Sequence, residues 1–242
     1  MPLLEVIDVS KSFGGVAANV GISFDVAAGE ILGLIGPNGA GKTSLFNAIS
    51  GDVSPDSGEI RLDGRRISGT GPVACAMAGV ARTFQVVRSF DSMTVRENVM
   101  VGAFARTTRT REAMAEADRV LALTGLAAVA ARPAHALSPP EKRRLEIARA
   151  LATRPRLLLL DEMLTGLTPT EAQSGMQLIR DVRQTGVTII MVEHVMEILL
   201  PLIDRAVVLN LGRVLASGLP RDLVRDPAVI RAYLGDKYAV NA

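Results

Sequence analysis

The stretch Gly36-Pro37-Asn38-Gly39-Ala40-Gly41-Lys42-Thr43, followed by Ser44, decides the fold. It fits the pattern G-x-x-x-x-G-K-[ST], whose glycines let the backbone curl until successive N–H groups point at a phosphate. The apolar run Ile31–Ile35 precedes it and has the length of a buried strand. A helix is predicted from Thr43 to Ser50, and its N-terminus adds a positive dipole end. The sequence therefore predicts a loop that binds the phosphates of a nucleotide.

Two side chains of this loop carry specific chemistry. Lys42 can bridge the β- and γ-phosphates, and the hydroxyl of Thr43 can bind Mg²⁺. A glycine-rich turn without a ligand is the alternative for so short a pattern, but a turn between a buried strand and a helix favours nucleotide binding. We expect the nucleotide to contact Gly36, Pro37, Asn38, Gly39, Ala40, Gly41, Lys42, Thr43 and Ser44.

A pair of carboxylates, Asp161 and Glu162, follows the apolar run Leu157–Leu160. Ligands bind at the carboxyl edge of a parallel sheet, where this pair would lie. Asp161 is expected to hold Mg²⁺, directly or through water. Glu162 points elsewhere and is expected to orient a water toward the γ-phosphate. Taken alone, the pair could be the polar end of a strand, but after a phosphate loop it predicts a hydrolytic site.

The last third of the chain alternates between strands and helices. The apolar runs Leu157–Leu160 and Val187–Val192 have the length of buried strands, and a helix is predicted between them over Thr170–Gln184. A strand, a helix and a second strand at this spacing predict a parallel sheet with crossover helices. Near the start, Val20–Val26 alternates apolar and polar residues as a half-buried strand does. We therefore expect an α/β fold.

A helical insertion interrupts this α/β pattern. Thr94-Val95-Arg96-Glu97 reads as a capping box, and an Ala- and Leu-rich helical segment runs from Glu112 to Ala131. Three basic residues precede that segment: Arg106, Arg109 and Arg111. The solvated start of a helix is the simpler interpretation, and contact with lipid head groups or a partner loop is the alternative. We predict a nucleotide-binding core over residues 1–87 and 153–242 and a helical subdomain over residues 88–152.

Composition excludes several classes of protein. The 242 residues carry 27 Lys plus Arg against 25 Asp plus Glu, a net charge of +2, so a basic surface for nucleic acid is not expected. The single cysteine, Cys75, excludes an intramolecular disulfide and fits a reducing cytosol. No apolar run approaches the roughly 20 residues that span a bilayer. We expect neither a membrane-spanning chain nor a nucleic-acid partner.

The ordered set of motifs resembles the ATP-binding subunit of an ABC transporter over nearly the whole chain. The motifs that carry the resemblance are Phe13, Gly36–Thr43, Gln85, Leu137–Arg144, Asp161-Glu162, Thr165–Thr168 and His194. The resemblance implies a P-loop NTPase (RecA-like) core with an antiparallel β subdomain and an inserted helical subdomain. It also implies an ATPase that uses ATP and Mg²⁺.

The resemblance assigns further roles to single residues. It implies that Phe13 stacks on adenine, that Gln85 contacts Mg²⁺ and the attacking water, and that His194 contacts the γ-phosphate. The expected catalytic residues are therefore Glu162, His194, Lys42 and Gln85, and the expected metal-binding residues are Thr43, Gln85 and Asp161. Without the family, Phe13 would be an ordinary core residue, Gln85 a surface residue and His194 a structural one.

A narrower resemblance is to the subunits of importers for branched-chain and other hydrophobic amino acids. It is carried by Lys11–Gly15, Arg143–Arg149 and Val229–Gly235. It implies a peripheral protein on the cytoplasmic face of the cell inner membrane. The implied partners are integral membrane permease subunits, a second ATP-binding subunit and, indirectly, a solute-binding protein.

The chain departs from the family at the signature loop, which usually reads L-S-G-G-Q and here reads Leu137-Ser138-Pro139-Pro140-Glu141. In the family this loop donates hydrogen bonds to ATP on the other subunit, and proline has no N–H to donate. The stretch is also a favourable helix start, a capping box with proline at the first helical position. Ser138 could still offer its hydroxyl to that nucleotide.

These prolines favour a heterodimer over a homodimer, because a homodimer would carry two poor sites. A regulatory or structural nucleotide-binding subunit with little turnover is the alternative function.

The chain departs from the family at two further positions. Met163 stands where proline is usual, and Thr168, in the loop Thr165–Thr168 that crosses the dimer in the family, replaces a common Asp or Asn.

Overall fold

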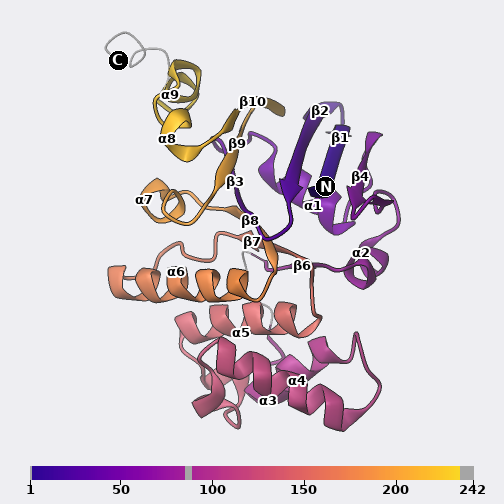
Figure 1. The fold of residues 1–242 in the computed structure, drawn as a ribbon, viewed down its shortest axis with the longest axis vertical. Coiled ribbons are helices and arrows are strands. Elements are labelled where there is room, and N and C mark those ends of the chain that lie inside the picture. The colour runs from indigo at the N-terminus through magenta and orange to yellow at the C-terminus, as the bar shows by residue number, and fades with distance from the viewer. Residues whose placement is uncertain (1, 85–88, 235–242) are drawn as a thin grey trace.

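The computed structural model describes residues 2–84 and 89–234 as two β-sheets with helices between and below them (Figure 1). The smaller sheet is antiparallel, with strand order β2-β1-β4-β5. Its strands are β1 (Pro2–Phe13), β2 (Val16–Ala27), β4 (Ser57–Leu62) and β5 (Arg65–Arg66). The half-buried strand predicted over Val20–Val26 lies within β2 and is confirmed.

The larger sheet has the order β10-β9-β3-β8-β7-β6. All neighbouring pairs are parallel except β9 and β10. Since β3, β8 and β7 are parallel neighbours, their carboxyl ends meet at one edge, where part of the site assembles. The strands are β3 (Ile31–Ile35), β6 (Val80–Arg82), β7 (Leu157–Asp161), β8 (Thr188–Val192), β9 (Arg205–Asn210) and β10 (Arg213–Gly218).

Side chains of β7 alternate between two hydrophobic cores. Leu157 and Leu159 face the core that joins the two sheets, in which helix α1 (Lys42–Ser50) buries Leu45 and Phe46. Leu158 and Leu160 face the opposite core. A strand that is buried on both faces has no polar positions, which explains the unbroken apolar run in the sequence.

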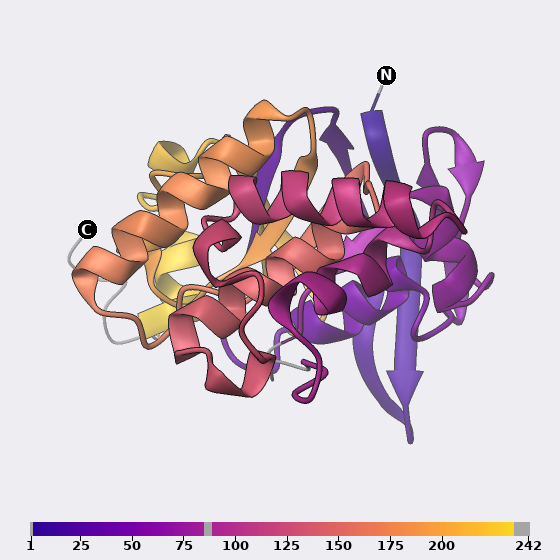
Figure 2. The same cartoon turned by 90° about the horizontal axis from the view of Figure 1, so that it is seen from below.

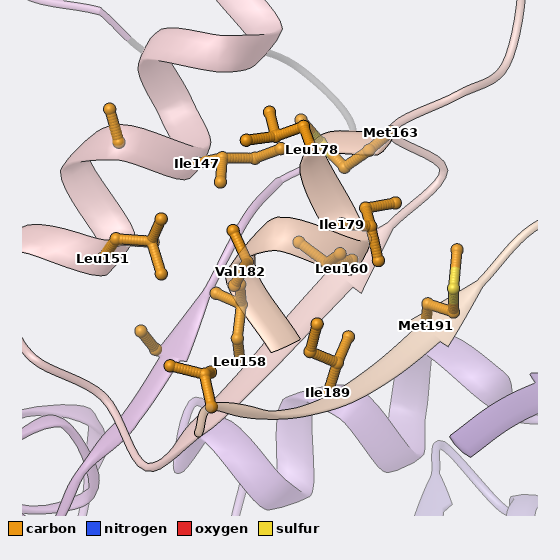
Figure 3. Close-up of a cluster of buried hydrophobic side chains, with 14 of the residues drawn as sticks. Ile147, Leu151, Leu158, Leu160, Met163, Leu178, Ile179, Val182, Ile189 and Met191 are labelled. Atoms are coloured by element: carbon orange, nitrogen blue, oxygen red, sulfur yellow. The ribbon is translucent and has the colours of Figure 1, made fainter. Parts of the chain in front are cut away.

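The opposite core joins the sheet to helices α5 (Pro139–Ala152) and α6 (Pro169–Gln184), as Figure 3 shows. The labelled side chains that meet there are Ile147 and Leu151 from α5, Leu178, Ile179 and Val182 from α6, Leu158 and Leu160 from β7, and Ile189 and Met191 from β8, with Met163 beside them. The same cluster continues into the helical insertion. The predicted domain boundaries stay predictions: the one at 87/88 lies outside the described residues, and near the one at 152/153 the insertion and the sheet share one core.

Helices α3 (Val95–Ala103) and α4 (Thr110–Leu123) pack on α5, and these helices lie in front of the sheets when seen from below (Figure 2). The predicted capping box is confirmed: the Thr94 N–H donates to Glu97 Oε2 at 2.7 Å, and the Glu97 N–H donates to Thr94 Oγ1 at 3.2 Å. The expected helical run to Ala131 is wrong, because α4 ends at Leu123. Gly125 then turns the chain with φ +72°, and short 3-10 turns follow (η1, Ala127–Val129; η2, Ala134–Ala136).

Of the three basic residues Arg106, Arg109 and Arg111, the first two precede α4 and the third lies within it. Arg106 is half-buried, and its guanidinium donates to the carbonyls of Thr153 (2.7 Å), Met77 (3.0 Å) and Ala76 (3.0 Å). It therefore ties the insertion to the carboxyl ends of helices α2 (Pro72–Ala78) and α5, so the prediction of a solvated residue is wrong for Arg106. Arg109 is exposed and pairs with Glu112 one turn along α4 (2.8 Å).

Three short helices follow β8: α7 (Met196–Leu199), α8 (Pro220–Leu223) and α9 (Pro227–Leu234). Within residues 2–84 and 89–234, no helix combines the length and apolar character needed to cross a membrane. A parallel core sheet, an antiparallel sheet and a helical insertion are all present, so the α/β fold class predicted from the sequence is confirmed.

Candidate active site

The loop from Gly36 to Thr43 joins the buried strand β3 to helix α1. Its glycines are required where the chain passes close to its neighbours. A Cβ on Gly41 (φ +102°) would lie 2.3 Å from the Ala18 carbonyl oxygen, and one on Gly36 (φ +153°) would lie 2.2 Å from the Leu209 carbonyl oxygen. Asn19 Nδ2 also donates to the Gly41 carbonyl at 3.1 Å. Residues Ala18 and Asn19 of strand β2 therefore pack against the loop at Gly41 and restrict its conformation.

The N-terminus of α1 is open to an anion. Its N-cap is Gly41, which supplies no side-chain acceptor, so the first amides of the helix lack the usual cap. Thr43 is exposed there and Ser44 is half-buried. Free amides at a helix N-terminus after a glycine loop form an anion site, so the loop fits a phosphate chain.

Lys42 lies folded against its own loop. Its ammonium group donates to the carbonyl oxygens of Gly36 (2.6 Å) and Pro37 (3.0 Å). Burial lowers the pKa of Lys42 below its usual value, while the carboxylates of Glu162 and Asp161 oppose this shift. The two carboxylates and the ammonium group therefore lie close enough to interact electrostatically.

Asp161 is buried at the end of β7. Its Oδ2 accepts a hydrogen bond from Arg82 Nη2 at 3.1 Å, and within the described residues no hydrogen bond to Oδ1 is found. In these residues there is also no group of three or more His, Cys, Asp or Glu side chains placed so that they could hold a metal ion by themselves. A carboxylate oxygen and the Thr43 hydroxyl fit Mg²⁺, which takes only one or two protein ligands when phosphates and waters supply the rest.

Four hydrogen-bonded contacts join the segment after β7 to the end of β8 and the residues that follow it. Glu162 has φ +51°, its N–H donates to the Val192 carbonyl at 2.9 Å, and its Oε1 lies 2.6 Å from His194 Nε2. Glu193 is buried and accepts from the Leu164 N–H (2.7 Å) and the Thr165 hydroxyl (3.1 Å). Glu162 and His194 therefore lie together, with Leu164 and Thr165 fixed beside them through Glu193.

Phe13 ends β1 on the antiparallel sheet and is 45% exposed. The Lys11 ammonium lies 5.5 Å from its ring centroid and is held by Asp56 at 2.6 Å. Phe13 is thus a surface aromatic and not a core residue, so its ring is accessible to a planar ligand.

The signature stretch forms a closed helix cap. The Ser138 N–H and hydroxyl both contact Glu141 Oε2, at 2.7 and 2.8 Å, and Pro139 begins α5. The predicted capping box is therefore confirmed. Thr168 caps α6 in the same way, through Glu171. The Ser138 hydroxyl, the one side-chain donor that the sequence offered for a partner nucleotide, is engaged inside its own helix start.

Two functional neighbours were not foreseen. Arg82 donates to Asp161, and Glu193 accepts hydrogen bonds from the loop after Glu162. Glu193 stands directly before His194, and a charged residue at the end of an apolar run is the only signal that could have found it. Gln85, predicted to contact Mg²⁺ and water, lies outside the described residues.

Known proteins define the class to which this fold and site belong. A family model described as ABC transporter matches residues 20–165, and a model described as branched-chain amino acid ATP-binding cassette transporter matches residues 213–239. A solved structure of the ADP conformation of an ATP-binding cassette of an ABC transporter superposes with a TM-score of 0.88 at 28% identity, covering 98% of this chain and 100% of that one.

Two relatives align over nearly their full length. The high-affinity branched-chain amino acid transport ATP-binding protein BraF of Pseudomonas aeruginosa is 41% identical over 253 residues, covering 97% of this chain and 98% of BraF. LivG of Escherichia coli strain K12, which carries the same description, is 41% identical over 251 residues with the same coverage. The chain belongs to the ABC transporter ATP-binding family and is an ATPase of that family.

Proposed function

We propose that this chain is the ATP-hydrolysing subunit of an importer for branched-chain or other hydrophobic amino acids. The observation that carries the ATPase role is the convergence of the Gly36–Thr43 loop, the Asp161-Glu162 pair and His194 at the carboxyl edge of one parallel sheet. The substrate class is supported by the family match over residues 213–239 and by the descriptions of BraF and LivG.

Each site residue then has a role in the hydrolysis. The loop amides and Lys42 hold the phosphates, with the Lys42 ammonium leaving its loop carbonyls for the phosphate oxygens. Glu162 orients the attacking water. His194, whose Nε2 contacts the Glu162 carboxylate, binds the γ-phosphate. Gln85 is proposed to contact the same water.

Mg²⁺, when bound, neutralises charge on the β- and γ-phosphates. Thr43 and Asp161 would hold it, and Gln85 is proposed as a third contact. Phe13 would stack on the adenine ring, an interaction of about 1 kcal/mol. The exposed position of Phe13 beside Lys11 supports this role.

We further propose a heterodimer with a second ATP-binding subunit. The signature of this chain serves the nucleotide of the partner, and Pro139 and Pro140 offer that nucleotide no N–H groups. The Ser138 hydroxyl is already bonded to Glu141. A partner with an intact signature would complete the site at Lys42, whereas two copies of this chain would make two weakened sites.

The complex would lie on the cytoplasmic face of the inner membrane, with this chain as a peripheral subunit. Permease subunits would contact the region after Gln85 and the helical insertion, and a solute-binding protein would act through the permease. The groove of about 350 Å³ beside Arg82, Phe84 and Arg149 supports this placement, because it lies between the insertion and the sheet.

The proposed function is tested on the complex purified from membranes. Co-purifying permease and ATPase subunits would be identified by mass, and amino-acid uptake would be measured in vesicles with ATP inside. Glu162→Gln is expected to reduce hydrolysis by about 100-fold or more while nucleotide still binds. Hydrolysis at the wild-type rate in this variant would contradict the role of Glu162.

The proline pair motivates a second candidate, a nucleotide-binding subunit with little turnover. Restoring the glycines with Pro139→Gly and Pro140→Gly separates the two. Unchanged ATPase activity of the complete complex supports the heterodimeric enzyme, and a large gain supports the low-turnover subunit.

A further inference from the structure

Arg82 is the last residue of β6, the edge strand next to β7. Its side chain is 9% exposed, and the guanidinium carbon lies near two aromatic rings, 5.7 Å from the Phe46 centroid and 5.3 Å from the Phe84 centroid. Cation–π contact favours a cation over a ring face, so both rings help to hold the guanidinium in this position.

The nitrogen atoms of this guanidinium reach in two directions. Nη2 donates to Asp161 Oδ2 at 3.1 Å, while Nη1 donates to Asn47 Oδ1 on α1 and to Asp52 Oδ2 (3.3 Å). Arg82 Nε is buried, and no hydrogen-bond partner for it is found in residues 2–84 and 89–234. Asn47 and Asp52 therefore fix the guanidinium in place, and Nη2 is held against Asp161.

This arrangement orients the Asp161 carboxylate. Arg82 occupies Oδ2, and Oδ1 has no hydrogen bond in the described part of the chain. The loop after β3 lies across β8 from Asp161, because β3 and β7 flank β8 in the sheet. Outer-shell partners that hold a ligating carboxylate fix its orientation for the metal.

We propose that Arg82 is the positioning residue for the Mg²⁺ ligand Asp161. The inference rests on the proposed role of Asp161. Arg82, Asp52 and Phe84 all line the groove of about 350 Å³, so one side chain contacts both the groove and the metal ligand.

The chemistry requires arginine in particular. A lysine ammonium is a point charge on a flexible stem, and it cannot bond Asn47 and Asp161 in the two fixed directions that the planar guanidinium provides. Arg82→Lys therefore keeps the charge and loses the orientation, whereas Arg82→Gln loses both. Arg106→Gln is the matched control, because Arg106 is also half-buried and bonds three carbonyls near the same groove without contact to Asp161.

The experiment measures ADP binding by calorimetry, once with excess MgCl₂ and once with EDTA. ADP is not hydrolysed, so the Kd in EDTA divided by the Kd in MgCl₂ reports how much Mg²⁺ strengthens ADP binding. We expect Arg82→Lys and Arg82→Gln to reduce this ratio by about tenfold and to change the Kd in EDTA by less than about twofold. Arg106→Gln is expected to lower the melting temperature and to leave the ratio unchanged.

Two results would overturn the inference. An unchanged ratio in both Arg82 variants means that the residue is only structural, and an increased ratio means that it competes with the cation. If the wild-type chain binds no ADP in either buffer, the proposed function fails and this inference fails with it. Normal ADP binding with an unaltered Mg²⁺ contribution rejects the inference alone.

Discussion

Gly41 shows how one residue shapes the phosphate loop. A Cβ at this position would collide with the Ala18 carbonyl, whereas a Cβ on Gly39 (φ +78°) would meet nothing within 4 Å. Both substitutions place alanine at a positive φ, which costs about 1–2 kcal/mol. We predict that Gly41→Ala reduces the free energy of unfolding by clearly more than Gly39→Ala, measured by urea unfolding. Equal losses would mean that the β2 contact does not constrain the loop.

A second prediction at the residue scale concerns how the Glu193 carboxyl makes the stability of the chain depend on pH. Burial raises the pKa of its carboxyl above the usual value of 4.5. Between 4.5 and the raised pKa the folded chain binds more protons than the unfolded chain, so this contribution to stability is complete below 4.5 and is lost as pH rises. We predict that the melting temperature of Glu193→Gln, measured relative to that of the wild type at the same pH, increases as the pH is raised from about 4.5 to 8.

Glu171 supplies a control of opposite sign. Hydrogen bonds from the Thr168 N–H and hydroxyl lower the pKa of Glu171, so its contribution is present above 4.5 and is lost as pH falls. Glu171→Gln should therefore lose melting temperature relative to wild type as pH rises. The same slope in both variants would reject the assignment for Glu193.

Residues of the site differ in how well the sequence predicts them. Lys42 and Asp161 stand in local patterns, a glycine loop and the end of an apolar run, so their positions follow from the sequence alone. Arg82 and Glu193 are set by contacts between segments 79 and 29 residues apart along the chain, and no local pattern records such contacts. Their roles required the tertiary structure.

Helix starts are the best predicted features among the elements. Thr94 and Ser138 begin helices through side-chain hydrogen bonds to residues three positions away, which a local sequence contains in full. Helix ends are less well defined: α4 stops at Leu123 because Gly125 adopts a positive φ and the chain turns, although its Ala- and Leu-rich composition continues. The short helix α2 was not predicted at all.

The cap of α3 provides a prediction at the scale of the element. Thr94→Ala removes the side chain that bonds Glu97, which should lower the free energy of unfolding by about 1 kcal/mol. Thr170→Ala, an exposed threonine inside the first turn of α6, should stay within about 0.5 kcal/mol of wild type. Denaturant unfolding of both variants checks this, and equal effects would contradict a capping role for Thr94.

For the whole molecule, the signature predicts the oligomeric state. Glu162→Gln is expected to trap bound ATP, and sedimentation with MgATP then measures whether two cassettes close together. We predict that this variant stays monomeric alone, because Pro139 and Pro140 cannot donate to the partner nucleotide. Adding Pro139→Gly and Pro140→Gly should strengthen self-association. A tight homodimer without the glycines would contradict the proposed heterodimer.

The central proposal is that the loop from Gly36 to Thr43 binds the phosphates of ATP, and calorimetric titration of the purified chain with MgATP tests it most directly. We predict saturable binding of one nucleotide per chain, together with loss of this binding in Lys42→Ala at an unchanged fold by circular dichroism. Absence of heat with the wild-type chain, or equal binding by the Lys42→Ala variant, would contradict it.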